Sequence, residues 1–195
     1  MLVGWYLRRA IPWMALLGCC AGALLLAAAV DRWPSTALVL LPALVAACAA
    51  AAAFCFDEPP LEVVAVTPRG ATWRRTARIA VALVPLLVWT VAVWVRPADL
   101  PLAQGSWWLV GLAAIGLTVG LAAVASRREV AAPGGSLAAA VVIVVIGPVV
   151  LAAFLGLDTL YPFGDFPSGV LTFWLAVAGA GALACVAAVR PGVGA

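Results

Sequence analysis

The ionisable side chains of this chain offer little catalytic chemistry. It contains no His and no Lys, so the commonest general base, the Schiff-base amine and the lysine of phosphate-binding loops are all missing. Asp57 and Glu58 are adjacent, and Asp158 and Asp165 lie in another loop, so no pair of carboxylates is placed to share a substrate. We therefore expect no catalytic residue, no metal or cofactor site and no enzymatic activity in this chain.

The five cysteines do not change that expectation. They are Cys19, Cys20, Cys48, Cys55 and Cys185, and no two have the CxxC spacing. All lie inside long apolar runs, where cysteine behaves as a small apolar side chain. We interpret them as packing residues.

Charge is concentrated in one polar segment. Between residues 57 and 78 the charged residues are Asp57, Glu58, Glu62, Arg69, Arg74, Arg75 and Arg78. The flanking sequence is almost free of charge over long stretches. A mostly apolar chain with so much charge in one loop is expected to use that loop to contact a partner in water.

The elements that position this loop follow from composition. Hydrophobic residues make up 67% of the chain and charged residues 10%, far from the values of soluble domains. Six charge-free runs each approach the roughly 20 residues that a membrane-spanning helix needs, and none alternates as barrel strands do. The sequence predicts an all-α polytopic membrane protein, one transmembrane domain over residues 1–195. The expected spans are 10–30, 36–56, 78–95, 106–126, 136–157 and 168–189, with a cytoplasmic coupling segment at 57–77.

The arginines predict the orientation. All 11 basic residues are Arg, and alternate loops hold nine of them against two, Arg32 and Arg96. Positive charge is retained on the cytoplasmic side, so we expect both termini there. This distribution disfavours a nucleic-acid site. The first apolar run is longer than that of a typical signal peptide, so we expect an uncleaved span.

The interiors of the expected spans are apolar. We find no ionisable residue deep within any of them, although ion-coupled carriers need such residues at membrane depth. Small-ion channels also need a polar lining. The spans fit a path for a hydrophobic or amphipathic molecule, and they fit equally a bundle that transports nothing.

Several residues bear on helix packing. Gly18-x-x-x-Gly22 and Gly116-x-x-x-Gly120 permit close helix approach, although such matches are frequent by chance in a chain rich in Ala and Gly. The mid-span prolines that can kink helices are Pro42, Pro85 and Pro148. The aromatic-rich outer segment 158–168 fits either a re-entrant element or a plain loop.

The polar segment has an internal order. Acidic residues come first, followed by the apolar stretch Leu61–Val66, by Thr67-Pro68 and by an arginine-rich run. Proline disfavours helix in the residue before it, so the apolar stretch should end there. We expect a short amphipathic helix under the membrane, shaped to lie in a groove of a soluble partner.

These residues resemble the type-2 ABC transporter permeases, whose members carry a similar pattern after the second span. The matching residues are Glu58, Leu61-Glu62-Val63-Val64, Thr67-Pro68, and Arg74, Arg75 and Arg78. The six spans, the cytoplasmic termini and the aromatic segment before the last span also look similar, and the arginine-only, Ala-rich style resembles actinobacterial proteins.

The resemblance implies a permease subunit of an ATP-driven exporter in a bacterial cell membrane. It implies that the polar segment is a coupling helix that docks onto an ATP-binding cassette subunit, which would bind ATP and Mg²⁺, and that a second permease copy or homologous permease completes the transporter within membrane lipids. The implied docking residues are Glu58, Leu61, Glu62, Val63, Val64, Thr67, Pro68, Arg69 and Arg74.

Two other interpretations stay open. The polar segment could be a solvated basic loop that only sets topology. The apolar bundle could also be a non-transporting scaffold or assembly subunit of a larger membrane complex.

Overall fold

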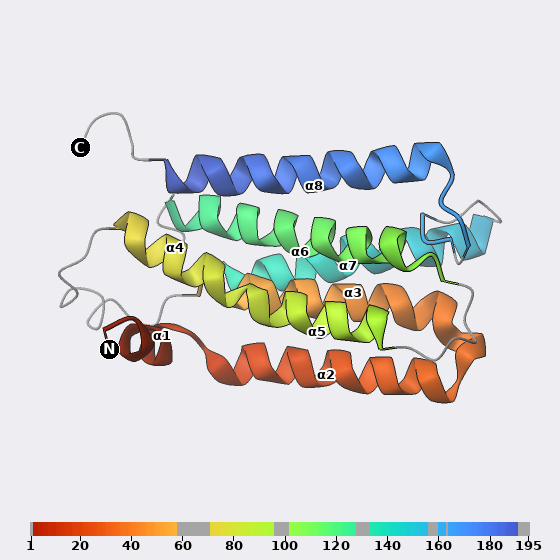
Figure 1. Ribbon diagram of the computed structural model, residues 1–195, viewed down its shortest axis with the longest axis horizontal. Coiled ribbons are helices and arrows are strands. Elements are labelled where there is room, and N and C mark those ends of the chain that lie inside the picture. The colour runs from red at the N-terminus through yellow and green to blue at the C-terminus, as the bar shows by residue number, and fades with distance from the viewer. Residues whose placement is uncertain are drawn as a thin grey trace.

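The chain folds as a helical bundle (Figure 1). The computed structural model describes residues 2–57, 71–95, 102–127, 133–155, 160–162 and 164–190. Within that part there are six helical spans long and apolar enough to cross a membrane. This confirms the predicted all-α fold class and identifies a multi-pass membrane protein.

The helix bounds can be compared with the expected spans. The elements are α1 (Leu2–Ala10), α2 (Trp13–Arg32), the short 3-10 helix η1 (Pro34–Thr36), α3 (Ala37–Phe54), α4 (Ala71–Val81), α5 (Leu83–Trp94), α6 (Gln104–Arg127), α7 (Gly134–Leu155) and α8 (Ser168–Val189). The third span, expected from residue 78, is built from α4 and α5 and begins further upstream.

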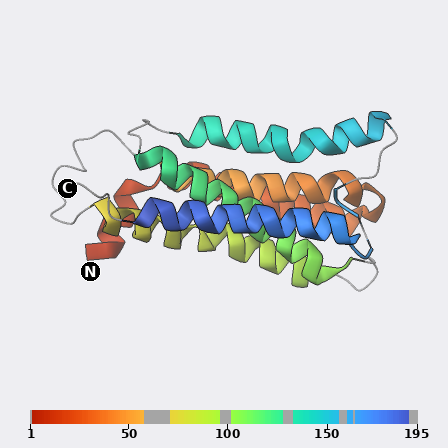
Figure 2. The same ribbon diagram turned by 90° about the horizontal axis from the view of Figure 1, so that it is seen from above.

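The core sits around α3 and α6. Helix α3 packs against α2, α7 and α6, and α6 packs most extensively against α8. Most of α3 and over half of α6 are buried, whereas α7 and α8 leave most of their surface exposed. Figure 2 shows α7 along one edge of the bundle. The exposed apolar side chains of α7 and α8 are available to contact lipid or another protein.

Helix α1 precedes the first expected span, where no helix was expected from the sequence. It runs across the bundle axis, beside the start of α2 (Figures 1 and 2). Tyr6 and Ala10 are buried, while Arg8 and Arg9 are exposed. Residues four apart share one helix face, so α1 is amphipathic. The Trp13 indole donates to the Leu7 carbonyl at 3.1 Å, which joins α1 to α2.

The third span is interrupted between α4 and α5. Val81 ends α4, and Ala82 forms a turn before α5 begins at Leu83. Pro85 explains the break, because a proline has no N–H and its ring crowds the carbonyl four residues earlier. Pro42 and Pro148, by contrast, lie inside helices that continue past them.

One of the two glycine motifs forms a close helix contact. A Cβ atom on Gly181 of α8 would lie 2.6 Å from the Leu117 nitrogen of α6, and one on Gly120 would lie 2.7 Å from the Ala184 Cβ. At Gly18 and Gly22 nothing lies within 4 Å of an added Cβ. The α6–α8 contact therefore depends on Gly120 and Gly181, whereas the glycines of the α2 motif make no close contact with the residues that the structure describes.

The described residues of the outer segment fold back into the bundle. Tyr161 is buried, and its hydroxyl donates to the carbonyl of Val145 at 3.2 Å. Val145 lies ten residues before the end of α7, about 15 Å along the helix. Of the two alternatives for this segment, residues 160–162 fit the re-entrant one.

Tryptophan side chains hold this re-entrant turn. The indoles of Trp107 and Trp174 donate to the carbonyls of Pro162 and Leu160 at 3.1 and 3.2 Å. The Tyr161 ring lies 6.0 Å from the Trp107 ring and 5.6 Å from the Trp174 ring, centroid to centroid. Buried indoles need a hydrogen-bond partner, and here the partners are the loop carbonyls. The turn therefore ties α6 to α8 at the end of the bundle opposite the chain termini.

Candidate docking site at the arginine-rich end

The docking residues expected from the sequence fall mostly outside the described residues. Glu58, Leu61, Glu62, Val63, Val64, Thr67, Pro68 and Arg69 all lie within 58–70, which the structure does not describe. Arg74 is described: it lies in α4 and is partly buried. The structure does describe the residues on either side of this segment, and both are attached to the bundle. We call them its roots: Phe56–Asp57 is the first root and helix α4 is the second.

Arg78 joins the two roots. It lies two turns into α4 and is only 2% exposed. Its Nη1 donates to the Phe56 carbonyl at 3.1 Å, and its Nε donates to the Tyr6 hydroxyl at 3.1 Å. A guanidinium is a rigid fork of donors, so one buried side chain fixes α4 to the end of α3 and to α1.

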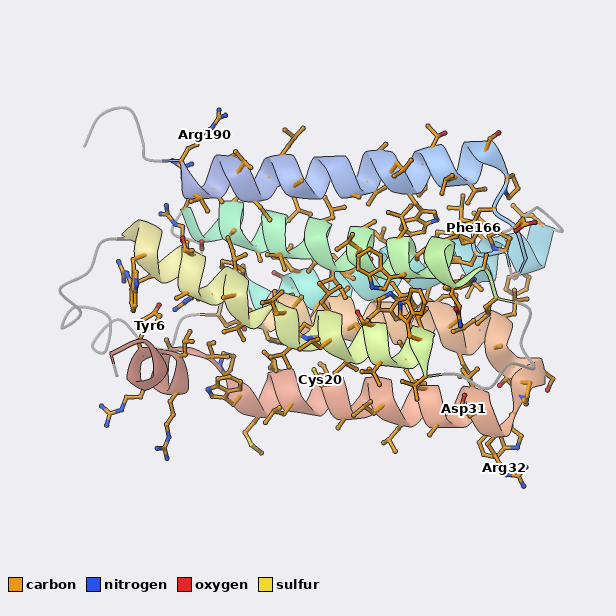
Figure 3. The ribbon with its side chains drawn as sticks, in the orientation of Figure 1. Tyr6, Cys20, Asp31, Arg32, Phe166 and Arg190 are labelled. Atoms are coloured by element: carbon orange, nitrogen blue, oxygen red, sulfur yellow. The ribbon has the colours of Figure 1, made fainter. Side chains whose placement is uncertain are left out.

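Aromatic rings cover this arginine. The Arg78 guanidinium carbon lies 6.0 Å from the centroid of the Tyr6 ring, and the Tyr6 ring lies 5.3 Å from that of Trp73. Figure 3 shows Tyr6 between α1 and α4. A cation near an aromatic face is attracted to it, and the rings also exclude water. Tyr6 therefore both accepts a hydrogen bond from the arginine and shields it.

Asp57 connects the first root to α7. Its carboxylate accepts a hydrogen bond from the backbone N–H of Gly134, the first residue of α7. The first N–H groups of a helix lack partners within it, and the helix dipole favours a negative charge there. A Cβ on residue 134 would lie only 2.5 Å from an Asp57 carboxylate oxygen, so a larger residue at that position would displace the Asp57 side chain.

The electrostatics of Asp57 are set by three effects. Burial raises the pKa of the Asp57 carboxyl above its ordinary value, while the hydrogen bond from Gly134 and the charge of Arg78 act to lower it. Desolvation is the largest effect, so the carboxylate is held at some electrostatic cost.

The second root is attached to α8. Arg75 of α4 donates to the Ala188 carbonyl at 3.4 Å, and Arg127 at the end of α6 donates to the Ala187 carbonyl. The last carbonyls of a helix lack partners and carry partial negative charge. The two arginines therefore hold the C-terminal end of α8 by hydrogen bonds from α4 and α6.

Arg74 differs from its neighbours. Its Nε atom is buried and has no hydrogen-bond partner within the described part of the chain. It is the one residue of the expected docking set whose surroundings can be described, and it lies on the same short helix as Arg75 and Arg78.

Other surfaces offer less chemistry. The described residues contain no group of three side chains suited to bind a metal ion. A shallow apolar hollow is lined by α7 alone, at Val142, Ile143, Ile146, Gly147, Val150, Leu151 and Phe154. It is open to the outside of the bundle and has no polar group to orient a ligand, so it is suited to contact with lipid tails.

Comparisons with protein-family models, with curated proteins and with solved structures found no match for this chain.

Three residues that join the helices at this end of the bundle were not among the docking residues expected from the sequence. Asp57 was counted only among the charges of the polar segment, Arg78 matched the pattern of type-2 permeases without being given a docking role, and Tyr6 was given no role in this site. Their importance depends on contacts across 22 to 77 positions of sequence. One signal in the sequence could have pointed to Arg78. This arginine is the first residue of the expected third span, 78–95, and an arginine buried at such a place requires hydrogen-bond partners.

Proposed function

We propose that this chain is the membrane-spanning permease subunit of an ATP-driven transporter of the type-2 ABC class, exporting a hydrophobic or amphipathic substrate across a bacterial cell membrane. The observation that carries the proposal is the attachment of both roots of the 58–70 segment to spans far along the chain. Asp57 bonds to the start of α7, and Arg75 bonds to the end of α8.

This attachment suits a segment that transmits force. An ATP-binding subunit docked on residues 58–70 would displace both roots together, because Arg78 joins them. The displacement would reach α1 through Tyr6, α7 through Asp57 and α8 through Arg75. ATP binding and hydrolysis would then shift the population between two arrangements of the spans.

The interior of the bundle supports an apolar substrate. Among the described residues the buried polar or charged side chains are Arg78 and Thr118. Arg78 lies at the arginine-rich end, and the Thr118 hydroxyl donates to the Ala114 carbonyl of its own helix. This part of the chain offers no polar relay for an ion, so the substrate is one that tolerates an apolar path.

Two further features support the proposal. Type-2 permeases have an amphipathic elbow helix before the first span, and α1 has that position and character. The exposed apolar faces of α7 and α8 leave room for a second permease. A single copy would otherwise expose these faces to lipid alone.

The decisive test is co-purification. The tagged chain, extracted from its host in mild detergent, is expected to bring down an ATP-binding cassette subunit at about one copy per permease, identified by mass spectrometry. A stable partner set without any ATPase would overturn the proposal and favour a non-transporting assembly subunit.

Variants then locate the docking segment. Leu61→Asp and Glu62→Arg are expected to abolish recovery of the ATPase and transport-coupled ATP hydrolysis, because each places the wrong charge on the docking surface. Arg32→Glu, a charge reversal in the outer turn, serves as the matched control and should retain both. Full assembly and activity in the Leu61 and Glu62 variants would exclude this segment as the docking site.

A further inference from the structure

Helix α7 carries a glycine–proline pair near its middle. Gly147 and Pro148 lie inside the helix, which continues past them to Leu155. Proline has no N–H, so it cannot donate the helical hydrogen bond to the carbonyl of Val144, four residues earlier. The residue before a proline is disfavoured in the helical conformation, and glycine adds further backbone freedom there. The pair is therefore a weak point of the helix.

The two parts of α7 on either side of this pair are held differently. In the first part, Ala138 forms a buried cluster with Ala50 and Ala53 of α3. Val145 is buried in the main core. Beyond Val149 none of the described side chains is buried, and the exposed ones are Val150, Leu151, Phe154 and Leu155. The first part is therefore fixed to α3, whereas the described side chains of the last part make no buried contact.

The face of α7 that points away from the bundle leaves room for a bend at this point. The shallow hollow described above is lined by residues from both sides of the pair, from Val142 to Phe154, and Gly147 is among them. No other helix in the described part of the chain lines it. The last part of α7 can therefore move toward the hollow without displacing another helix.

Tyr161 supplies the hydrogen-bond donor that such a bend requires. In an α-helix the carbonyl of residue 145 accepts from the N–H of residue 149, which lies beyond Pro148, so a bend between them breaks this bond. A carbonyl without a partner is costly in hydrocarbon. The Tyr161 hydroxyl already donates to the Val145 carbonyl at 3.2 Å, and one carbonyl oxygen can accept two hydrogen bonds. The Val145 carbonyl therefore keeps a partner when α7 bends.

Tyr161 is itself held in place from both sides. The indole of Trp107 donates to the carbonyl of Pro162, and the indole of Trp174 donates to that of Leu160. These tryptophans come from α6 and α8, which approach each other closely. Since Val145 is fixed to the core and Tyr161 to the α6–α8 pair, their hydrogen bond persists while the last part of α7 moves.

We propose that Gly147-Pro148 is a hinge of α7, and that the Tyr161 hydroxyl permits the bend by pairing with the Val145 carbonyl. Helix α7 then has two arrangements: the continuous one seen in this structure and one bent toward the hollow. The change is confined to the end of the bundle opposite the chain termini, because Gly134 at the start of α7 is bound by Asp57. This inference does not rest on the transporter proposal.

The test measures distances between pairs of spin labels by electron paramagnetic resonance, on the full chain in lipid nanodiscs. One pair is attached to Leu155→Cys, beyond the hinge, and Leu175→Cys of α8. The other is attached to Ile143→Cys, before the hinge, and Leu183→Cys of α8. All four native side chains are exposed, so the labels disturb little packing. The first pair should show two distances, and the second pair should show one.

The labels require a background without native thiols. Alanine replaces all five cysteines, and the thermal midpoint of this background is compared with that of wild type. The replaced residues are Cys19, Cys20, Cys48, Cys55 and Cys185.

Tyr161→Phe separates a hinge from a brace. It keeps the ring packed between the tryptophans and removes only the hydroxyl. The bent population should fall by at least about fivefold, because the bent form then leaves the Val145 carbonyl without a partner. A hydroxyl that merely braced the continuous helix would give the opposite result, since its loss would increase bending.

Pro148→Ala tests the hinge itself. Alanine supplies the N–H that proline lacks, so the second distance of the first pair should disappear. The matched control is Pro42→Ala, at a proline inside α3, which should leave both distances in place.

The possible outcomes decide the proposal. A single distance for the first pair in the chain with native Pro148 and Tyr161 would overturn the hinge, as would two distances that persist in Pro148→Ala. An equal loss in Pro42→Ala would show that bending depends on packing throughout the bundle and would overturn a local hinge. A bent population that is unchanged or larger in Tyr161→Phe would overturn the role of the hydroxyl and make it a brace of the continuous helix.

Discussion

The Nε of Arg78 donates a hydrogen bond to the Tyr6 hydroxyl at 3.1 Å, across 72 positions of sequence, inside an otherwise apolar bundle. A charged side chain is costly to bury unless its donors are used. Here the same guanidinium also bonds to the Phe56 carbonyl. Burial raises the pKa of the Asp57 carboxyl, and the charge of Arg78 offsets part of this rise. One arginine thus holds α1, the end of α3 and α4 together at the base of the polar segment.

Arg78→Met should destabilise the protein by roughly 2–4 kcal/mol, because it leaves a buried hydroxyl and a buried carbonyl without their donor. Arg78→Lys should recover part of this loss, since an ammonium cannot reach both acceptors with the geometry of a guanidinium. Denaturation in detergent micelles measures the difference. Arg190→Met, at an exposed arginine, should change stability by less than about 0.5 kcal/mol.

A double-mutant cycle tests whether Tyr6 and Arg78 act together. Tyr6→Phe alone should cost about 1–3 kcal/mol, because it removes the acceptor of a charged donor. If the pair is coupled, the double variant Tyr6→Phe with Arg78→Met should be more stable than the sum of the single losses predicts, by about 1 kcal/mol. Strict additivity would show that the two side chains stabilise the fold independently.

Asp57→Ala should weaken the start of α7. The variant loses the acceptor of the Gly134 N–H and the charge that favours the helix N-terminus, a cap of the kind that contributes about 1 kcal/mol. Hydrogen exchange should show faster exchange in the first turn of α7, with α2 unaffected. Asp31→Ala, at an exposed position, is the matched control. Equal protection of α7 in both variants would contradict the role of Asp57.

The number of spans could be predicted from sequence because it needs only length and apolarity. The aromatic outer segment 158–168 could not be assigned, since the burial of Tyr161 depends on a carbonyl of α7 and on two indoles from α6 and α8. Helix α1 was missed for a similar reason. Nine residues form a marginal helix alone, and this one is held by Tyr6 and by the Trp13 indole.

The break at Ala82 shows a second limit. Three mid-span prolines look alike in sequence, yet only Pro85 separates two helices in the described part of the chain. Tertiary packing decides which helix continues past its proline and which is interrupted. The docking residues expected from the sequence remain a prediction, since Arg74 alone among them lies in the part of the chain that the structure describes. The contacts of Asp57, Arg75 and Arg78 could not be predicted, because each joins residues far apart in the sequence.

Asp57 should also give a measurable pH dependence. Burial raises its pKa in the folded state, so over the range between the ordinary and the raised pKa the native state binds more protons than the unfolded state. The contribution of this group to stability is therefore greatest at low pH and is lost as pH rises through the folded-state pKa. The difference in thermal midpoint between wild type and Asp57→Asn should fall as pH rises. A difference that rises would mean that the hydrogen bond and Arg78 outweigh desolvation.

The contact between α6 and α8 yields the last prediction. A Cβ on Gly181 would lie 2.6 Å from the Leu117 nitrogen and 2.7 Å from the Gly116 carbonyl carbon. These are backbone atoms, which cannot rotate away, so Gly181→Ala must push the two helices apart. Overpacking of this kind costs about 1–3 kcal/mol, to be read from the thermal midpoint in detergent.

Gly18→Ala on α2 is the matched control, because nothing lies within 4 Å of an added Cβ there. Alanine is about 1 kcal/mol better than glycine in a helix interior, so this variant should be unchanged or slightly more stable. A Gly181→Ala protein as stable as Gly18→Ala would show that α8 packs against α6 less closely than the structure has it. If the Gly18→Ala variant is less stable than wild type in its native complex but not when isolated, another protein packs on α2.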